Sequence, residues 1–399
     1  MKPVLKTTYR SLKGIVLTAT ATVLFSCGSH PKNFDNALDY ALSSPSKKIK
    51  KVMDNLEAHE LQILLTTVER DLTENLVFLE HSFQLDSLDY FYPASTVKFP
   101  AAVLSLEKLT ELNRSHLDHY MVEGDTSMYN FAATINEIFA VSDNEANNRL
   151  FEFLGSDYIN SKLKSKGIHP LRISHRLSTS DAANPTTKTI DLRSNGNNTL
   201  TIHSNTNNTP RPLKLNHLNK GIGYIQDGLP IGTPFDFSYK NYFSLSAQHE
   251  MIKRVIFPEA FKASERFLIS EEKRNFLLES MHKLPREQGY DPKTYYESYG
   301  KFLWFGDTKK QLPKHIKIYN KVGYAYGTLT DCAFIEDRKN NLSYFVTATI
   351  LVNQNGIFND NNYEYDSIGI PFLAELGRQI HKYEKHRKKH LRTSMSKGQ

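Results

Sequence analysis

The stretch that decides the fold reads Phe91-Tyr92-Pro93-Ala94-Ser95-Thr96-Val97-Lys98-Phe99-Pro100. It contains a Ser-x-x-Lys pair, and residues 101–109 after it place apolar side chains at helical spacing. If the helix begins at or just before Ser95, the side chains of Ser95 and Lys98 lie about one turn apart on one face. A serine hydroxyl becomes a good nucleophile when a neighbouring base takes its proton, and a lysine with a lowered pKa can be that base. In isolation, the pair would be read as a helix-capping serine followed by a solvated lysine.

Two further motifs change this interpretation. Val141-Ser142-Asp143-Asn144 precedes a segment with helical spacing that ends at Gly155, so Ser142 or Asp143 can cap a helix. Lys321-Val322-Gly323 ends a run in which apolar and polar residues alternate, as they do in a half-buried strand. A glycine there lets a substrate lie close to the strand edge. Each motif alone is also compatible with an ordinary cap or turn.

In this order, the three motifs resemble the set found in class A serine β-lactamases and penicillin-binding proteins. The resemblance extends from about residue 50 to about residue 385. It implies an α/β (α+β) serine β-lactamase/D,D-peptidase-like fold, with an antiparallel sheet of about five strands, flanking helices and a mostly helical subdomain. We therefore expect a signal peptide at 1–27, a tether at 28–49, a catalytic domain at 50–385 with its helical half at about 96–220, and a basic tail at 386–399.

The resemblance also implies the roles of the site residues. Ser95 would attack an amide or ester carbonyl, with Lys98 as the base that receives its proton. Ser142 would pass a proton to the leaving nitrogen, and Lys321 would tune Ser142 and attract a substrate carboxylate. Asn144 would hold the acyl side chain, Gly323 would allow close approach, and the backbone N–H groups of Ser95 and Tyr324 would bind the oxyanion.

Two residues depart from the family pattern. The family glutamate that activates the deacylating water has no counterpart, because no glutamate occurs between Glu152 and Glu250. Asp181 is a candidate replacement, although its spacing is one residue short. Val322 stands where the family carries Thr or Ser, so a hydroxyl that would bind a substrate carboxylate is missing.

The net charge of the chain is +7, and it comes from the two ends, because the part between them is mildly acidic. Residues 1–27 combine basic residues with a short apolar run that ends Leu24-Phe25-Ser26-Cys27, which resembles a bacterial lipoprotein signal. We expect export, lipidation of Cys27 and anchoring to the cell envelope; a plain secretory signal is the alternative. The basic C-terminal segment could contact an anionic surface or be a solvated end. Nothing indicates nucleic-acid binding, and we expect a monomer.

The spacing of the cysteines and histidines limits which disulfides and metal sites the chain can form. Cys332 is the only cysteine after Cys27, so no intramolecular disulfide is expected in the folded body, and its strand-like surroundings predict a core thiol. The histidines show no metal-ligand spacing, and we expect neither metal nor cofactor.

The predicted function is therefore that of a serine hydrolase acting on a β-lactam or a related amide, with β-lactam breakdown and antibiotic resistance as the implied outcome. The alternatives are a D,D-peptidase or esterase with slow deacylation, or a non-catalytic envelope protein that binds peptidoglycan fragments.

Overall fold

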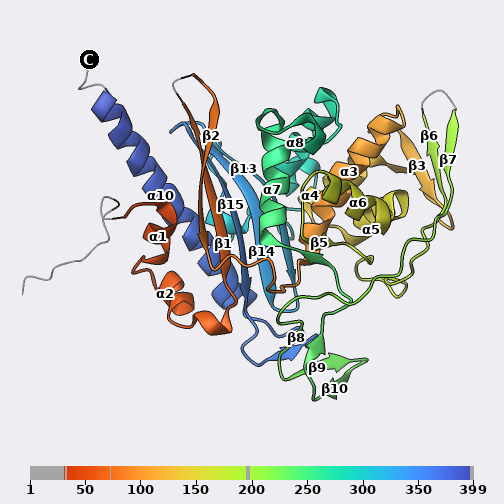
Figure 1. Ribbon diagram of the computed structural model, residues 1–399, viewed down its shortest axis with the longest axis horizontal. Helices are drawn as coiled ribbons and strands as arrows, with labels where there is room; N and C mark the ends of the chain where they lie inside the picture. Colours follow the sequence, from red (N-terminus) through yellow and green to blue (C-terminus); the bar gives the residue numbers. More distant parts are fainter. Residues whose placement is uncertain (1–30, 32–33, 72, 195–197, 396–399) are drawn as a thin grey trace, which may run out of the picture.

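A five-stranded antiparallel sheet forms the centre of the molecule (Figure 1), with the strand order β13-β14-β15-β1-β2. The computed structural model describes residues 31, 34–71, 73–194 and 198–395. The expected signal peptide, including Cys27, lies outside these residues. The strands of this sheet are β1 (Gln62–Arg70), β2 (Leu76–Phe83), β13 (Ile316–Ala325), β14 (Thr328–Asp337) and β15 (Leu342–Leu351).

Alternation of side chains along the strands builds two cores, one on each face of the sheet. On β15, Tyr344, Val346 and Ala348 enter one buried cluster, whereas Phe345 enters the other. Successive residues of a strand point to opposite faces, so a strand covered on both sides is apolar throughout. The predicted core position of Cys332 is confirmed, since its thiol is buried on β14 and burial raises its pKa to about 12.

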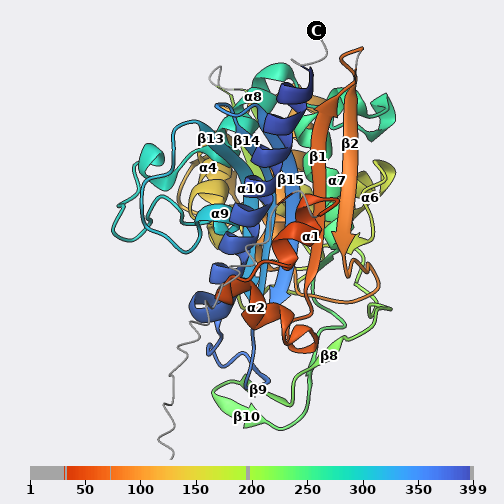
Figure 2. The same ribbon diagram turned by 90° about the vertical axis from the view of Figure 1, so that its left-hand side faces the viewer.

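One face of the sheet is covered by helices from both ends of the chain. Figure 2 shows α10 lying across this face beside α1 and α2. The hydroxyl of Tyr383 on α10 donates to the backbone carbonyl of Phe34, at 2.9 Å, and so fastens the start of the described chain to the last helix. These elements are α1 (Ala37–Leu42), α2 (Lys47–Met53), the kinked turn α9 (Phe302–Phe305) and α10 (Ile370–Met395).

The other face carries α7 and the helical half of the molecule (Figure 1). As the sequence predicts, a glycine ends α5: Gly155 has φ of 76°. The same residue precedes α6, so the chain turns sharply between two buried helices. The helices are α3 (Lys98–Glu111), α4 (Phe131–Ala140), α5 (Asn144–Leu154), α6 (Ser156–Ser165), α7 (Leu245–Ile256) and α8 (Glu271–His282).

Short strands, which the sequence indicates only in part, decorate both halves. Around residues 190–202, β6 pairs with β7 in a hairpin that joins β3 and β4 in a small sheet. These strands are β3 (His119–Val122), β4 (Tyr129–Asn130), β6 (Ile190–Arg193) and β7 (Thr199–Ile202). The others are β5 (Leu171–Arg172), β8 (Asn219–Lys220), β9 (Gly223–Gln226), β10 (Leu229–Ile231), β11 (Phe235–Asp236), β12 (Tyr242–Phe243) and β16 (Ile357–Phe358).

The C-terminal segment differs from the expected solvated tail. Helix α10 continues through the predicted boundary at residue 386 to Met395. Glu69 on β1 forms ion pairs with Arg387 and Lys388, which gives this basic helix a partner on the sheet. Among the described residues, no helix combines the length and apolar character required to cross a bilayer.

Candidate active site

The nucleophile candidate lies in a tight turn at the start of α3. Residues Ala94–Val97 form a 3-10 turn, and α3 begins at Lys98. Ala94 has φ of 48°, a left-handed conformation that costs energy for a residue with a Cβ. The hydroxyl of Thr96 donates to the carbonyl of Pro93 at 2.7 Å and stabilises the turn. Ser95 is therefore presented, half-buried, at the wall of a large cavity.

Lys98 is fully buried beneath this turn. Its Nζ donates to Asn144 Oδ1 at 2.6 Å, to the backbone carbonyl of Ser142, and to Ser142 Oγ at 3.3 Å. Burial lowers the pKa of Lys98 to about 7, and the negative charge of Asp143 opposes this shift only in part. A lysine with this pKa is substantially neutral at physiological pH, which a general base must be.

The Ser142–Asn144 turn connects Lys98 to two other segments. Ser142 has φ of 58°, and the side chain of Asp143 caps α5 by accepting from the Ala146 N–H at 2.7 Å. Of the two capping candidates, Asp143 is the one observed. Asn144 donates through Nδ2 to Ser178 Oγ at 3.0 Å, so this amide joins Lys98 to the loop after β5.

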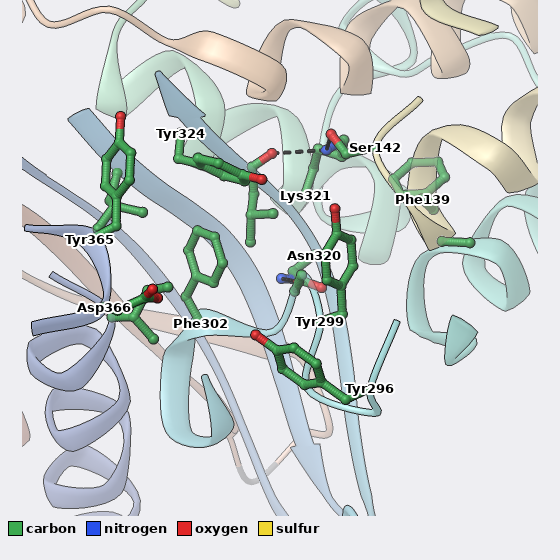
Figure 3. A pocket seen from close by; sticks show the side chains of 15 residues that line it. Phe139, Ser142, Tyr296, Tyr299, Phe302, Asn320, Lys321, Tyr324, Tyr365 and Asp366 are labelled. Carbon is green, nitrogen blue, oxygen red and sulfur yellow. Dashed lines mark hydrogen bonds between the residues drawn. The ribbon is translucent and has the colours of Figure 1, made fainter. Parts of the chain in front are cut away.

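Lys321 approaches Ser142 from the sheet. Its Nζ donates to Ser142 Oγ at 2.8 Å and to the carbonyl of Val322 at 2.8 Å, and Figure 3 shows Lys321 reaching Ser142. Burial, reinforced by the nearby charge of Lys98, lowers the pKa of Lys321 well below its ordinary value. The hydroxyl of Ser142 thus lies between two buried amines.

A glycine permits the sheet to contact the nucleophile turn. A Cβ at Gly323 would lie 2.6 Å from the carbonyl oxygen of Pro93 and 2.9 Å from the backbone nitrogen of Ser95. Both neighbours are backbone atoms that cannot move aside cheaply. The following residue, Tyr324, is 48% exposed and lines the cavity into which Ser95 opens. The Ser95 and Tyr324 regions are thereby adjacent, as an oxyanion hole requires.

Buried polar groups support Lys321 from behind. Asn320 donates to Asp331 Oδ1 at 2.8 Å and accepts from Lys301 Nζ at 2.6 Å. Burial raises the pKa of Asp331 to about 6 and lowers that of Lys301 to about 8. These three side chains hold β13 against residues 300–303 through buried hydrogen bonds, for which water does not compete.

Two cavities meet at the site. The larger, of about 860 Å³, is lined by Ser95, Asn144 and the loop containing Ser178. The smaller, of about 210 Å³, is lined by Ser142, Lys321 and several aromatic rings, and Figure 3 shows these residues together. Tyr324 and Tyr365 line both. A substrate with its carbonyl at Ser95 can therefore extend in two directions.

The loop at 168–187 is held by a buried ion pair. Arg176 donates to both carboxylate oxygens of Glu152, at 2.5 and 2.9 Å, and also to the carbonyls of Asn184 and Thr186. The guanidinium is thus occupied by structural partners, although it lies at the wall of the larger cavity. Glu152 stabilises this loop from α5 and is not free to act as a base.

Asp181 does not line the larger cavity. It is exposed, accepts from the Thr179 hydroxyl at 2.6 Å, and is absent from the described residues that line that cavity. Hydrogen bonding to Thr179 lowers its pKa, which makes the carboxylate a weaker base. His175 does line the cavity, but burial lowers its pKa to about 4 and both ring nitrogens bond to backbone groups.

The structure thus brings Lys98, Ser142, Asn144 and Lys321 into direct contact and places Ser95 and Gly323 beside them. Sequence reasoning missed Ser178 and the aromatic lining of the smaller cavity. The aromatic residues that were missed are Phe139, Tyr296, Tyr299, Phe302 and Tyr365; Tyr324, which was predicted, and the carboxylate of Asp366 line the same cavity. In the sequence, the signal that could have pointed to this aromatic lining is the cluster of tyrosines at residues 290–299.

Comparison with a family model and with solved structures identifies the relatives. Residues 45–207, which carry Ser95, Lys98, Ser142 and Asn144, match the model described as the Beta-lactamase enzyme family. This part of the chain is therefore similar to the serine β-lactamase family. A search of curated proteins gave no significant match.

Solved structures of this family share the fold. A representative class A β-lactamase from Bacteroides cellulosilyticus is 13% identical, with a TM-score of 0.51, over 89% of this chain and 99% of that one. The protein named PBP-A is 13% identical, with a TM-score of 0.50, over 88% and 97%. A β-lactamase from Desulfarculus baarsii is 14% identical, with a TM-score of 0.50, over 86% and 97%. The predicted serine β-lactamase-like fold is confirmed.

Proposed function

We propose that the protein is a hydrolase of this family that forms an acyl-enzyme on Ser95 with a β-lactam or a related amide or ester and releases it slowly. The observation that carries the proposal is the continuous set of hydrogen bonds from Lys98 through Ser142 to Lys321. Lys98, a buried lysine with a pKa of about 7, supplies the base, and Ser95, one turn away at the wall of the larger cavity, supplies the nucleophile.

Each residue has a step in the proposed reaction. Ser95 Oγ attacks the carbonyl carbon while Lys98 takes its proton. The oxyanion accepts from the backbone N–H groups of Ser95 and Tyr324, and each such donor is worth on the order of 3 kcal/mol in the transition state. The proton then passes through Ser142 to the leaving atom, and Lys321 holds Ser142 in place. Asn144 and Gly323 position the acyl side chain and the scissile bond.

Slow release follows from the lining of the larger cavity. Within the part of the chain that the structure describes, no aspartate or glutamate lines this cavity. The histidine that does, His175, has both nitrogens engaged. A water attacking the acyl-enzyme therefore finds no carboxylate base among the described residues that line this cavity, and we assign the role of base to Lys98. This behaviour is closer to that of a penicillin-binding protein, and a D,D-peptidase or esterase activity is the second candidate.

The test is the intact mass of the protein lacking its signal, followed over time after mixing with a penicillin. We expect an adduct on Ser95 that forms in the wild type, is absent in Ser95→Ala, and decays slowly. Rapid loss of the adduct with consumption of the drug would indicate an efficient β-lactamase. The absence of any adduct, with a reactive phosphonate ester as well as with penicillin, would favour a non-catalytic protein that binds peptidoglycan fragments.

We also propose that the protein is exported and anchored to the cell envelope through a lipid on Cys27, as its leader sequence indicates. Replacing Cys27 with serine should move the protein from the membrane fraction to the soluble fraction after cell breakage. Retention of the Cys27→Ser protein in membranes would contradict this anchor. The active fraction should run as a monomer on gel filtration in detergent.

A further inference from the structure

The smaller cavity is the side of the site that receives a leaving group. Ser142, the proposed donor of a proton to the leaving atom, lines this cavity, whereas Ser95 and Asn144 line the larger one. A substrate whose carbonyl is at Ser95 and whose leaving atom is at Ser142 must place its leaving group here. This inference rests on the proposed function and adds the chemical class of its substrate.

Six aromatic residues are among the fifteen that line the smaller cavity. Tyr324 packs edge-on against Tyr365 with ring centroids 5.5 Å apart, and Phe302 lies 6.2 Å from Tyr324. Tyr296 and Tyr299 form the opposite wall, with centroids 6.1 Å apart and planes at 84° (Figure 3). Burial raises the pKa of both Tyr299 and Tyr365, so their phenols stay neutral. Such a box presents electron-rich faces to its contents.

A carboxylate stands at the rim of this box. Asp366 lies in the π-helical turn Tyr365–Gly369 that precedes α10, and its side chain lines the cavity. In the described part of the chain it forms no ion pair with a lysine, arginine or histidine. Figure 3 shows Asp366 and Lys321 at opposite ends of the cavity. Burial and, after it, the negative charge of Asp366 raise the pKa of Tyr296.

The described residues that line this cavity offer no free positive group to a substrate carboxylate. No arginine is among the described residues that line it, and Val322 brings no hydroxyl. Lys321 is only 3% exposed and already donates to Ser142 and to a backbone carbonyl. A leaving group carrying a carboxylate would lose its hydration near Asp366 and gain no counter-charge.

We propose that the natural leaving group carries an alkylated ammonium in place of a carboxylate, and that the aromatic box and Asp366 bind this cation. In the reaction the Ser95 Oγ–acyl bond forms and the bond from the acyl carbon to the leaving heteroatom breaks, with its electron pair remaining on that heteroatom. The proton lost by Ser95 passes through Lys98 and Ser142 to the heteroatom, and water later cleaves the ester on Ser95.

Three thioesters of the same acyl group test this preference. Their leaving thiols are thiocholine, its uncharged isostere 3,3-dimethylbutanethiol, and 3-mercaptopropionate, and thiol release reports cleavage. We expect kcat/KM to be about tenfold higher for thiocholine than for the isostere, and lowest for the carboxylate. Asp366→Asn should bring the thiocholine-to-isostere ratio towards one. Asp227→Asn, a matched charge loss on an exposed turn outside the cavity, should keep that ratio.

A second pair of variants addresses the rings. Tyr296→Phe keeps an aromatic face and should retain the preference, whereas Tyr296→Leu should lose most of it. Ser95-dependent cleavage that favours the carboxylate, or that treats thiocholine and its isostere alike, would overturn the preference and leave the hydrolase proposal standing. Cleavage of all three thioesters at the rate of the Ser95→Ala protein would refute the hydrolase itself.

Discussion

Acidification should stop acylation of Ser95 with a midpoint near the pKa of Lys98, because only the neutral amine can take the serine proton. That pKa falls from the ordinary 10.5 to about 7 through burial. At about pH 7 roughly half of the amine is neutral, compared with roughly one molecule in three thousand for an unperturbed lysine. The difference corresponds to about 5 kcal/mol of differential stabilisation of the neutral form.

One substitution moves this midpoint in a known direction. The carboxylate of Asp143 favours the charged form of Lys98, so Asp143→Asn should lower the midpoint by about one pH unit. Asparagine also caps helices well and can still accept from the Ala146 N–H, so α5 should stay intact. Glu145→Gln removes an exposed charge from the same helix and serves as the matched control.

The assay is the single-turnover acylation rate with a chromogenic ester or penicillin, measured from about pH 5 to about pH 9. The rate should rise with pH and level off above the midpoint, which reports the free enzyme. A rate independent of pH over this range, or a midpoint that rises in Asp143→Asn, would refute the assignment of Lys98 as the base. An equal shift in Glu145→Gln would show that the Asp143 effect is not local.

Three further outcomes follow from the geometry. Gly323→Ala should lower the acylation rate by at least about a hundredfold, since its Cβ would meet backbone atoms at 2.6 and 2.9 Å. The control is Gly232→Ala, which has open space around it and should leave the acylation rate unchanged. Equal acylation rates in the two variants would contradict the close contact at Gly323. Glu152→Gln leaves the buried Arg176 charge without its counter-ion and should cost about 3–5 kcal/mol in urea unfolding, and a loss below about 1 kcal/mol would argue against it. Asp181→Asn should leave the decay of the acyl-enzyme, followed by mass spectrometry, unchanged; a much longer-lived adduct would restore Asp181 as the base.

The central sheet was predictable because its strands are either alternating apolar and polar residues or continuous apolar runs, and turn residues separate them. A strand that is buried on both faces needs apolar residues at nearly every position. The motif residues were predictable for a different reason: Ser95, Lys98, Ser142 and Lys321 each belong to a short sequence motif with fixed spacing, beside a helix start or within a strand. Their contacts across the chain came from the resemblance and not from local pattern.

Other features have no local signature. The strands between residues 171 and 243 are two to four residues long, too short for a period to emerge. The continuation of α10 past residue 386 depends on ion pairs with Glu69, which lies more than three hundred positions earlier in the chain. The aromatic box combines Tyr296, Tyr299 and Phe302 from a turn-rich segment with Tyr324 of β13 and Tyr365 from the turn before α10, so no local stretch of sequence reveals it.

The strand order affects how the protein folds while it is being synthesised. The first strand, β1, pairs with β15, so that Gln62 lies opposite Thr349 with most of the chain between them. A polypeptide that emerges from its N-terminus cannot complete the sheet until its last strand is available, and such non-local pairing slows folding. The hairpin β1–β2 must wait, unpaired on one edge, throughout synthesis and any export. A truncation just before β15 therefore removes the middle of the sheet, although it removes only the end of the sequence.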